Sequence, residues 1–578
     1  MESRRQPNSA DNNPQTQPAE PYQDVAKRYA LSLCARVESF DSNPLHSAAY
    51  LTYLAKYLKT PFQKPRRRPH VSSSPNPPSS RPFLIQYLIQ EDNPPKIQPY
   101  DDPHQWAGLP VSPNCNELLF LTGRPSADWL NCIGSKYSID HRFFHQHLGP
   151  IISGYGHSNT GGTYPDLPSR SLQVISLQIP TILIIGSQGR NLHIKDLEVA
   201  RDTCNSQLRR ACQAVQDSAA TESGRSMIRG VEIFDGSTIV VEQQLTGTIV
   251  HRDNKLWTII LWSDAGHETD HTYIPIPSTK DFAPVASDLK FCPVFFENEF
   301  VKTSTPPVPR QDERLHAKQP LSLLSHHYGL TLDWSTPATT SSPLFVLTEL
   351  FSFQAASILQ LLNTLERVFS EMTERCDFPS YEHTKLEMTV QYDYIRSSLS
   401  RLEQHCSDII TFLKSPPAKW NGPNPAGQSG TTLITTDFEY LLSRTRNLLK
   451  TCESGRSTLV TNDAIQKAKR SAVEARLVTQ LTKTTTRLGY IFVPISFVTS
   501  AFGMNFAELG QGNMSIWIWA VTVVPMLIVC VVIVEFGGWI ARWWRGLGKK
   551  ENKVNAWERD RYQDKGLGPP LSSENTDG

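Results

Sequence analysis

Two uncharged apolar stretches near the end of the sequence decide the fold. Residues 490–506 read YIFVPISFVTSAFGMNF, and residues 516–534 read IWIWAVTVVPMLIVCVVIV. The first, counted over 488–505, and the second approach the roughly 20 residues that a helix needs to cross a hydrocarbon core about 30 Å thick. A pair of buried core helices is the alternative, but uncharged runs of this length are rare in soluble folds. We therefore predict transmembrane helices over 487–505 and 516–540, joined by an outer loop over 506–515.

Basic residues flank this predicted hairpin on both sides, whereas its loop has no Lys or Arg and only one acid, Glu508. Because Lys and Arg are enriched on the cytoplasmic side of membrane proteins, we expect both termini in the cytoplasm, or in the matrix of a mitochondrion. We expect a plasma-membrane protein ahead of a mitochondrial inner-membrane protein, with the lipid bilayer as a partner. The flanking residues are Lys467, Lys469, Arg470, Arg476, Lys483 and Arg487, then Arg542, Arg545, Lys549, Lys550 and Lys553.

The first predicted span carries small polar residues, which a simple apolar anchor would not need. Ser496, Thr499, Ser500 and Gly503 follow one another at intervals of three, one and three residues. Small polar residues on one helical face either let helices pack closely or line a water-filled path. The residue pattern alone leaves both readings open.

A long helical pattern leads into this span. It begins near residue 432 and meets no Pro before Pro494, so a continuous helix to residue 505 would measure about 110 Å at 1.5 Å per residue. The apolar pattern weakens over 451–458, where Gly455 allows a break or a kink. We predict a helical stalk over 341–486. Two earlier patterns with helical spacing, over 347–369 and 386–413, belong to it.

The first half of the chain mixes short strand and helix patterns. We expect a cytoplasmic α/β domain over 83–340, a disordered, Pro-rich region over 1–82 and a basic, disordered tail over 541–578. The expected strands lie at 84–89, at 172–185 as one strand or two divided by Pro180, and at 237–244, 246–251 and 256–262. The expected helices lie at 126–133, 140–148 and 192–215.

Composition narrows the class of protein. The 578 residues are enough for two to four domains, and a mean hydropathy of −0.35 excludes a polytopic transporter with many spans. A net charge of +1 gives no sign of a nucleic-acid partner. The ten cysteines are scattered without a C-x-x-C pair, which favours free thiols over a disulfide framework or a zinc module.

One string fits an enzyme motif but not its structural context. Residues 267–271 read HETDH and match the H-E-x-x-H pattern, whose two His must share one face of a helix. Two prolines, Pro275 and Pro277, follow so closely that a helix there is disfavoured. We expect no enzyme activity, no catalytic residue, no cofactor and no tightly bound metal.

The string over 490–506 resembles the pore helix of the CorA family of magnesium and divalent-cation transporters, especially in its fungal branch. Pro494 stands eleven residues before Asn505, a Phe-Val-Thr stretch follows, and Gly503-Met504-Asn505 closes the segment. The string LLFLTGRPSADWLNCIGSKYSIDHRFFHQHL over 118–148 resembles a block in the amino-terminal domain of fungal CorA-like proteins. The resemblance covers roughly residues 85–545.

The resemblance implies a homopentamer, in which an α/β domain feeds a stalk and the first span lines a five-fold pore. It implies that Asn505 presents an amide oxygen at the outer mouth, beside Gly503 and Met504, as a filter for a hydrated divalent ion. Glu508 would attract cations there. The further pore-lining candidates are Thr482, Thr485, Val493, Ser496, Thr499 and Ser500.

Two departures from the bacterial relatives bear on mechanism. The outer loop lacks their Met-Pro-Glu-Leu string, and Thr482 and Thr485 stand where those relatives have bulky apolar residues in the neck of the pore. The resemblance implies a channel or transporter that passes magnesium or a similar divalent cation down its electrochemical gradient, and the two departures motivate other readings. A membrane-tethered scaffold that does not conduct, or a zinc transporter of the same fold, are the alternatives.

Overall fold

The structure is a computed structural model of the full chain. It describes residues 22–39, 51–63, 83–90, 93–152, 173–185, 194–217, 224–252, 256–266, 289–294, 319–329, 332, 334, 341–376, 382–420, 428–502, 515–532 and 536. The chain divides into two compact units, Met1–Val460 and Thr461–Gly578, and each is described by itself.

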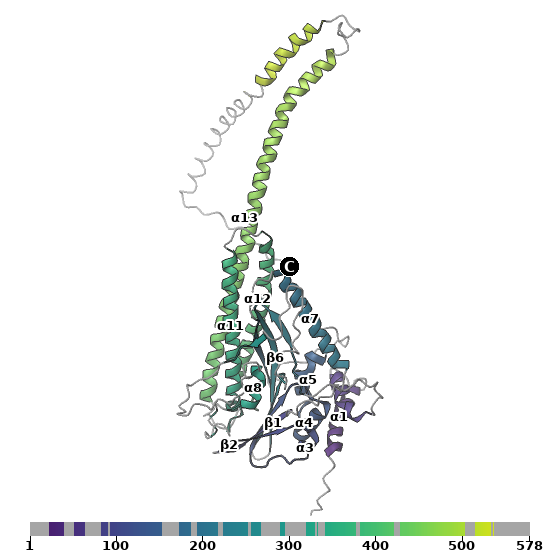
Figure 1. Ribbon diagram of the computed structural model, residues 1–578, viewed down its shortest axis with the longest axis vertical. Helices are drawn as coiled ribbons and strands as arrows, with labels where there is room; N and C mark the ends of the chain where they lie inside the picture. The colour runs from purple at the N-terminus through teal and green to yellow at the C-terminus, as the bar shows by residue number, and fades with distance from the viewer. Residues whose placement is uncertain are drawn as a thin grey trace, which may run out of the picture. The chain divides into compact units, whose positions relative to one another are not determined.

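A mixed sheet forms the centre of the first unit (Figure 1). Its strand order is β2-β1-β3-β7-β6-β4-β8, with β5 paired to β6. All of these pairs are antiparallel except β3 with β7, where Leu119 lies opposite Ile260. The strands are β1 Leu84–Gln90, β2 Asn93–Tyr100, β3 Asn116–Thr122, β4 Val174–Ile185, β5 Gly230–Ile233, β6 Thr238–His251, β7 Trp257–Ser263 and β8 Leu289–Phe291.

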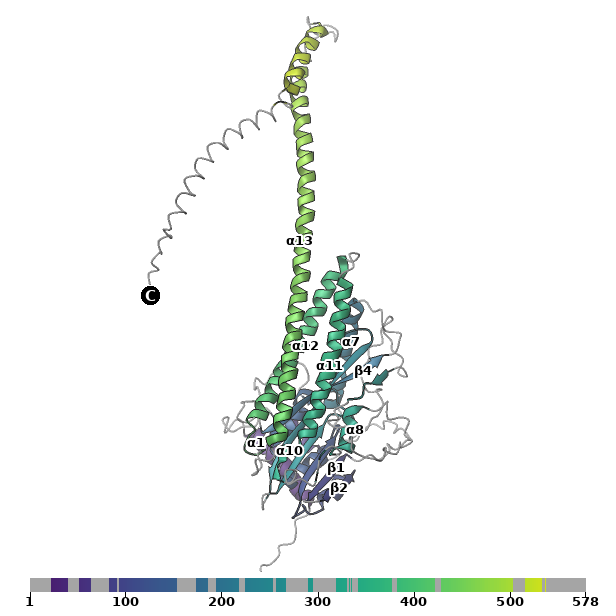
Figure 2. The ribbon, with the colours of Figure 1, turned by 90° about the vertical axis from the view of Figure 1, so that its left-hand side faces the viewer.

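Helices cover both faces of the sheet because its central strands are apolar on both sides (Figures 1 and 2). Successive side chains of a strand point to opposite faces, so Leu118 joins one core and Leu119 another. The first core includes α8 Pro320–His327, α10 Pro343–Val346, α11 Thr348–Cys376, α12 Glu382–Lys414 and the start of α13 Gln428–Phe502. The other face carries α3 Pro103–Ala107, α4 Ala127–Tyr137, α5 His141–Ile152 and α7 Ile194–Asp217.

Part of the region over 1–82 is helical. It contains α1 Tyr22–Glu38, α2 Thr52–Lys59 and the short 3-10 turn η3 Thr60–Phe62. Leu33 of α1 and Leu58 of α2 are fully buried in the core beneath α4. Apolar spacing on both helices gives them a face to bury, so they dock on the α/β part.

Pro180 lies inside one continuous strand, β4, and does not divide it. The strand pairs with β6 on one side, and over this stretch helical side chains occupy the other side. His405 Nε2 accepts a hydrogen bond from the backbone N–H of Gln178 at 3.2 Å, and Gln354 Nε2 donates to the Gln178 carbonyl at 2.9 Å. Ser357 Oγ donates to the carbonyl of Pro180. Proline is tolerated because this side of β4 needs no further strand.

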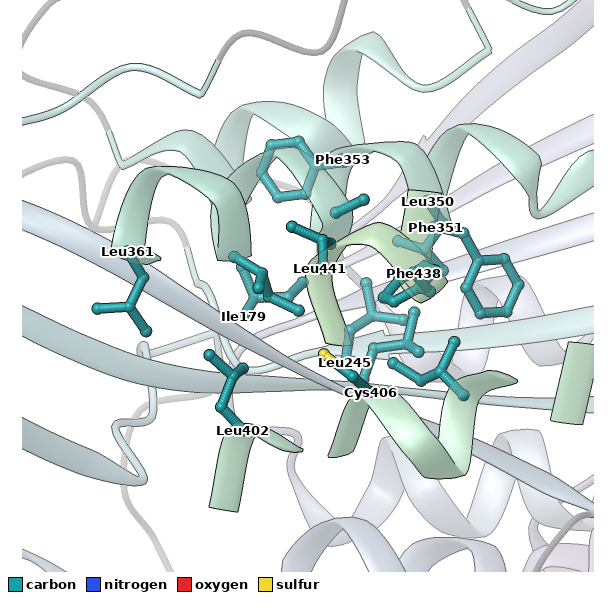
Figure 3. Close-up of a cluster of buried hydrophobic side chains, with 14 of the residues drawn as sticks. Ile179, Leu245, Leu350, Phe351, Phe353, Leu361, Leu402, Cys406, Phe438 and Leu441 are labelled. Atoms are coloured by element: carbon teal, nitrogen blue, oxygen red, sulfur yellow. The ribbon is translucent and has the colours of Figure 1, made fainter. Parts of the chain in front are cut away.

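The first part of α13 packs with α11 and α12 against the sheet (Figures 2 and 3). The helix runs without a break through Gly455. Leu441 and Phe438 of α13 meet Leu350 of α11 and Cys406 of α12 in one buried cluster. At Gly455 an added Cβ would lie 2.7 Å from the Tyr392 hydroxyl, so this glycine permits close helix contact. Leu459 is the last residue of α13 in this core, so the helices over 343–459 pack against the sheet of the first unit.

Candidate functional site

The predicted site residues fall partly on described positions. Thr482, Thr485, Val493, Ser496, Thr499 and Ser500 lie on α13, within the second unit. Gly503, Met504, Asn505 and Glu508 lie outside the described residues, as do the H-E-x-x-H string at 267–271 and the tail over 541–578. The geometry of the site is therefore that of the helix leading to the Gly-Met-Asn tripeptide.

Among the helices that the structure describes, none combines the length and the apolar character needed to cross a membrane.

One face of α13 packs against the helix over 516–532, drawn in yellow in Figure 1. Val498 and Val523 are 8% and 6% exposed, which makes them the most buried apolar side chains of the described part of this unit. The contact leaves a cavity of only about 10 Å³. It is lined by Ile491, Pro494, Ile495 and Val498 from α13, and by Val523, Met526, Leu527 and Cys530 from the second helix.

The predicted pore-lining residues lie on the opposite face. At about 100° per residue, the positions of Thr482, Thr485, Val493, Ser496 and Ser500 fall within about 80° of one another, and Thr499 lies about 40° beyond one end of that arc. The face that packs on the second helix is centred about 180° away. The side chains of this polar arc are all exposed in the single chain, and Val493 is 68% exposed. The structure thus brings five of these candidates together on the side of α13 that the second helix leaves open, and Thr499 lies between that side and the covered one.

Hydrogen bonds inside the helix orient several hydroxyl groups. Ser496 Oγ donates to the Val493 carbonyl at 3.2 Å, and Thr499 Oγ1 donates to the Ile495 carbonyl at 2.8 Å. Each hydroxyl hydrogen is directed to the helix backbone, so the lone pairs of the oxygen face outward. An oxygen presented in this way is an acceptor, which is the ligand type that hard divalent cations and their bound waters prefer.

The two threonines that the resemblance places in the neck of a pore are exposed in the structure. Thr482 and Thr485 are exposed on the same arc as Ser496, and the carbonyl of Thr482 accepts a hydrogen bond from Thr486 Oγ1 at 2.7 Å. Thr484, between them in sequence, points to the other side of the helix and donates to the Gln480 carbonyl at 3.0 Å. It has the same chemistry as Thr482 and Thr485 but lies off the arc.

Sequence reasoning missed the buried polar groups of the first unit. His147 and Asp264 are fully buried, with His147 Nε2 3.0 Å from Asp264 Oδ1 and Nδ1 2.7 Å from Thr246 Oγ1. Burial lowers the pKa of His147 to about 4, although Asp264 opposes that shift. No solvent reaches these side chains, so they hold the core together. In the described part of the chain, no three His, Cys, Asp or Glu side chains gather closely enough to hold a metal ion.

Comparisons with known proteins bear on the same region. Residues 338–535 match the family model for the CorA-like Mg²⁺ transporter protein, which confirms the resemblance to this family over that part of the chain. The matched residues run from α10 to the second helix and include Gly503-Met504-Asn505. The fungal branch stays a prediction.

Among solved structures, the chain is similar to the complete CorA magnesium transporter from Methanocaldococcus jannaschii at 12% identity and a TM-score of 0.30. That match covers 78% of this chain and 96% of the transporter. It is also similar to the full-length CmaX protein at 10% identity and a TM-score of 0.20, over 81% of this chain and 99% of that one. No curated protein matches the chain.

Proposed function

We propose that the chain forms a membrane channel or transporter that passes magnesium or a similar divalent cation down its electrochemical gradient. The observation that carries the proposal is the two-sided character of α13 beyond Thr461. Its Val498 face packs on the helix over 516–532, and its Ser496 face presents oxygens that this helix leaves uncovered. The family match over 338–535 supports transport of a divalent cation as the class of function.

Exposed apolar side chains around this pair of helices support an environment of lipid and partner chains. Phe492 and Phe497 on α13 are 63% and 73% exposed, and Trp517 on the second helix is 73% exposed. Exposed apolar patches of this kind are costly in water and are satisfied by a bilayer or by partner chains. In our proposal the spans run over 487–505 and 516–540, and the Trp side chains lie at the lipid–water interface. The basic flanks then put both termini on the cytoplasmic side, with the plasma membrane as the expected location.

A single copy of α13 cannot enclose a path, because its oxygen-bearing face is open. Copies related by rotation can close a ring with that face toward the axis, and the resemblance to CorA implies five of them. In such a homopentamer the aromatic and aliphatic side chains beside the arc, such as Phe497 and Phe492, would meet neighbouring copies. Self-association is thus part of the proposal.

The proposed path conducts without covalent chemistry. Magnesium loses its water reluctantly, so a ring of hydroxyl and amide oxygens that binds the hydrated ion weakly permits entry and release. We assign the filter to Asn505 at the outer mouth, beside Gly503 and Met504, with Glu508 drawing cations toward it. Ser500, Thr499, Ser496 and Val493 follow deeper, and Thr485 and Thr482 form the neck.

Complementation of cells deficient in magnesium uptake tests this function. The full chain is expected to restore growth at low magnesium, and Asn505→Ala at equal surface expression is expected not to. Thr484→Val is the control. Thr484 lies on the side of α13 opposite the polar arc, so this variant should restore growth as the wild type does. No rescue by the well-expressed full chain would favour the non-conducting scaffold, and growth that depends on zinc in place of magnesium would reassign the ion.

A further inference from the structure

Two carboxylates of the central sheet lie together beneath α12, away from the proposed ion path. Glu232 on β5 is 5% exposed, and Glu242 on β6 lies on the same face, because Gly230 stands directly opposite Glu242. A Cβ at Gly230 would lie 2.6 Å from Glu242 Oε2. The glycine therefore leaves the space that the second carboxylate occupies.

The two carboxylates share one cation from α12. Arg401 Nη2 donates to Glu232 Oε1, and Glu242 Oε1 lies 3.7 Å from the same nitrogen. Ser398 Oγ, one turn earlier on α12, donates to Glu232 Oε2 at 2.7 Å. The Arg401 side chain is 58% exposed, so water screens much of its charge, whereas the Glu232 side chain is only 7% exposed.

The other charged group that faces this cluster comes from α7 and is already engaged. Arg201 Nη2 donates to the Ile233 carbonyl at 2.7 Å and to Gln391 Oε1 at 2.5 Å. Its guanidinium lies 3.7 Å from the ring centre of Tyr394 on α12, whose hydroxyl accepts a hydrogen bond from the backbone N–H of Ile233. Arg201 thus acts on Glu232 through space and not by direct contact.

We propose that Glu232 is a proton-sensitive contact in this fold, which holds α12 most firmly on the sheet when protonated and loosens it as the pH rises through neutrality. The geometry gives the reason. A nearly buried carboxylate beside a second carboxylate loses hydration and meets like charge when it ionises, and one half-exposed guanidinium offsets only part of that cost.

The direction of the pH effect follows from linkage. Burial, and then Glu242, raise the pKa of Glu232 to about 7, while Arg401, Ser398 and Arg201 act in the opposite sense. If α12 moves off, Glu232 reaches water and its pKa returns toward the ordinary value of about 4.3. The docked form therefore binds the proton more tightly, and ionisation at higher pH favours release of α12.

A change at the Glu232 contact with α12 can reach other helices of the first unit. Ile395 and Leu402 of α12 belong to the core shared with α11 and the start of α13. Looser docking of α12 would therefore reach the other helices of this core. The proposal stands on the first unit alone and does not depend on the proposed transport.

Hydrogen–deuterium exchange of the purified full chain tests the proposal, read on peptides covering residues 391–404 at about pH 6 and about pH 8. After correction for intrinsic exchange, we expect opening of this segment to increase about tenfold from the lower to the higher pH. Glu232→Gln, which mimics the protonated side chain, should exchange slowly at both values. Glu403→Gln is the matched control, because the half-buried Glu403 accepts a hydrogen bond from Arg446 of α13 and lies outside the Glu232 cluster, and it should keep the tenfold change.

Equal corrected exchange of the wild type at both pH values would overturn the proposal, as would an unchanged pH response in Glu232→Gln. If Glu232→Gln fails to fold, the same exchange measurement on Glu242→Gln tests the proposal instead. Removing the neighbouring charge should shrink the pH response, and a full tenfold response in that variant would count against the role of the carboxylate pair.

Discussion

Val498 on α13 and Val523 on the helix over 516–532 line the same contact and are the most buried apolar side chains of the described part of the second unit. Their contact fixes which side of α13 is covered. The covered side is apolar and contains Pro494, while the opposite side carries the hydroxyl groups. The proposed ion path follows from this division, because only an uncovered face can line a path.

Cysteine cross-linking checks the helix pairing directly. Ile491 and the native Cys530 line the same small cavity, so Ile491→Cys is expected to form a disulfide with Cys530 on mild oxidation. Phe492→Cys, one residue on and 63% exposed at the native side chain, should not. Both variants are made in a chain whose other cysteines are replaced, and the link is read by mass spectrometry. Equal linking of the two variants would mean that this face of α13 is not the covered one.

The polar arc predicts which threonines matter for flux. Replacing Thr482 and Thr485 together by Leu introduces apolar bulk into the proposed neck, and a narrow apolar constriction excludes water. We expect magnesium flux to fall at least tenfold in reconstituted vesicles. Thr484→Leu, on the other side of the helix, should retain flux within about twofold. A similar loss in Thr484→Leu would indicate a general effect on the helix and would remove the support for a polar neck.

We predict that Gly455→Ala lowers the stability of the protein, with Gly489→Ala on the same helix as the control. Gly455→Ala forces a Cβ to within 2.9 Å of three Tyr392 side-chain atoms, and overpacking of this kind costs about 1–3 kcal/mol. At Gly489 nothing in the single chain lies within 4 Å of an added Cβ, so Gly489→Ala creates no such overpacking and should leave the stability of the first unit unchanged. Thermal unfolding of the two variants measures the difference, and Gly455→Ala with wild-type stability would contradict the close contact.

Buried histidine predicts acid sensitivity of the first unit. Burial lowers the pKa of His405 to about 4, and its Nε2 accepts a hydrogen bond from the backbone N–H of Gln178, which a protonated ring could not do. In the unfolded chain His405 binds a proton near pH 6.5, whereas in the folded chain it binds one only near pH 4. The unfolding free energy should therefore fall as the pH drops through this window, by up to about 3 kcal/mol from this group.

The control for this prediction removes the titrating ring. In His405→Gln the decrease between about pH 6.5 and about pH 4 should be smaller by a similar amount, measured by denaturant unfolding at each pH. An identical acid profile for His405→Gln and the wild type would show that His405 does not take up the proton on unfolding.

Much of the element order could be predicted from the sequence because apolar periodicity is a local signal. The expected strand at 84–89 and helix at 192–215 appear as β1 and α7 with small shifts of their ends. The sequence suggested two strands where β6 is one, because Leu245 continues the strand between β4 and β7, opposite Leu177 and Ser263. The order of the strands could not be predicted from local patterns, because β3 and β7 pair although more than a hundred residues separate them in the sequence.

The candidate site likewise has a part that the sequence could predict and a part that only the fold creates. The hydroxyl residues of the first span could be selected from spacing, and the structure places them on one arc of α13. Which arc is uncovered depends on a contact with residues 516–532, and no single stretch of sequence contains that information. Likewise, Glu232 and Arg401 are far apart in the sequence and meet only because α12 docks on β5. The Gly503-Met504-Asn505 filter stays a prediction, because these positions lie outside the described residues.

The most direct test of the central claim is the accessibility of the uncovered face during transport. Magnesium flux is measured in vesicles that contain Ser496→Cys in a chain whose other cysteines are replaced, before and after a positively charged methanethiosulfonate reagent. The proposal predicts that the reagent abolishes flux through Ser496→Cys and leaves Ile491→Cys, on the covered face, unaffected. Flux through Ser496→Cys that continues unchanged after complete labelling would contradict the assignment of this face to the ion path.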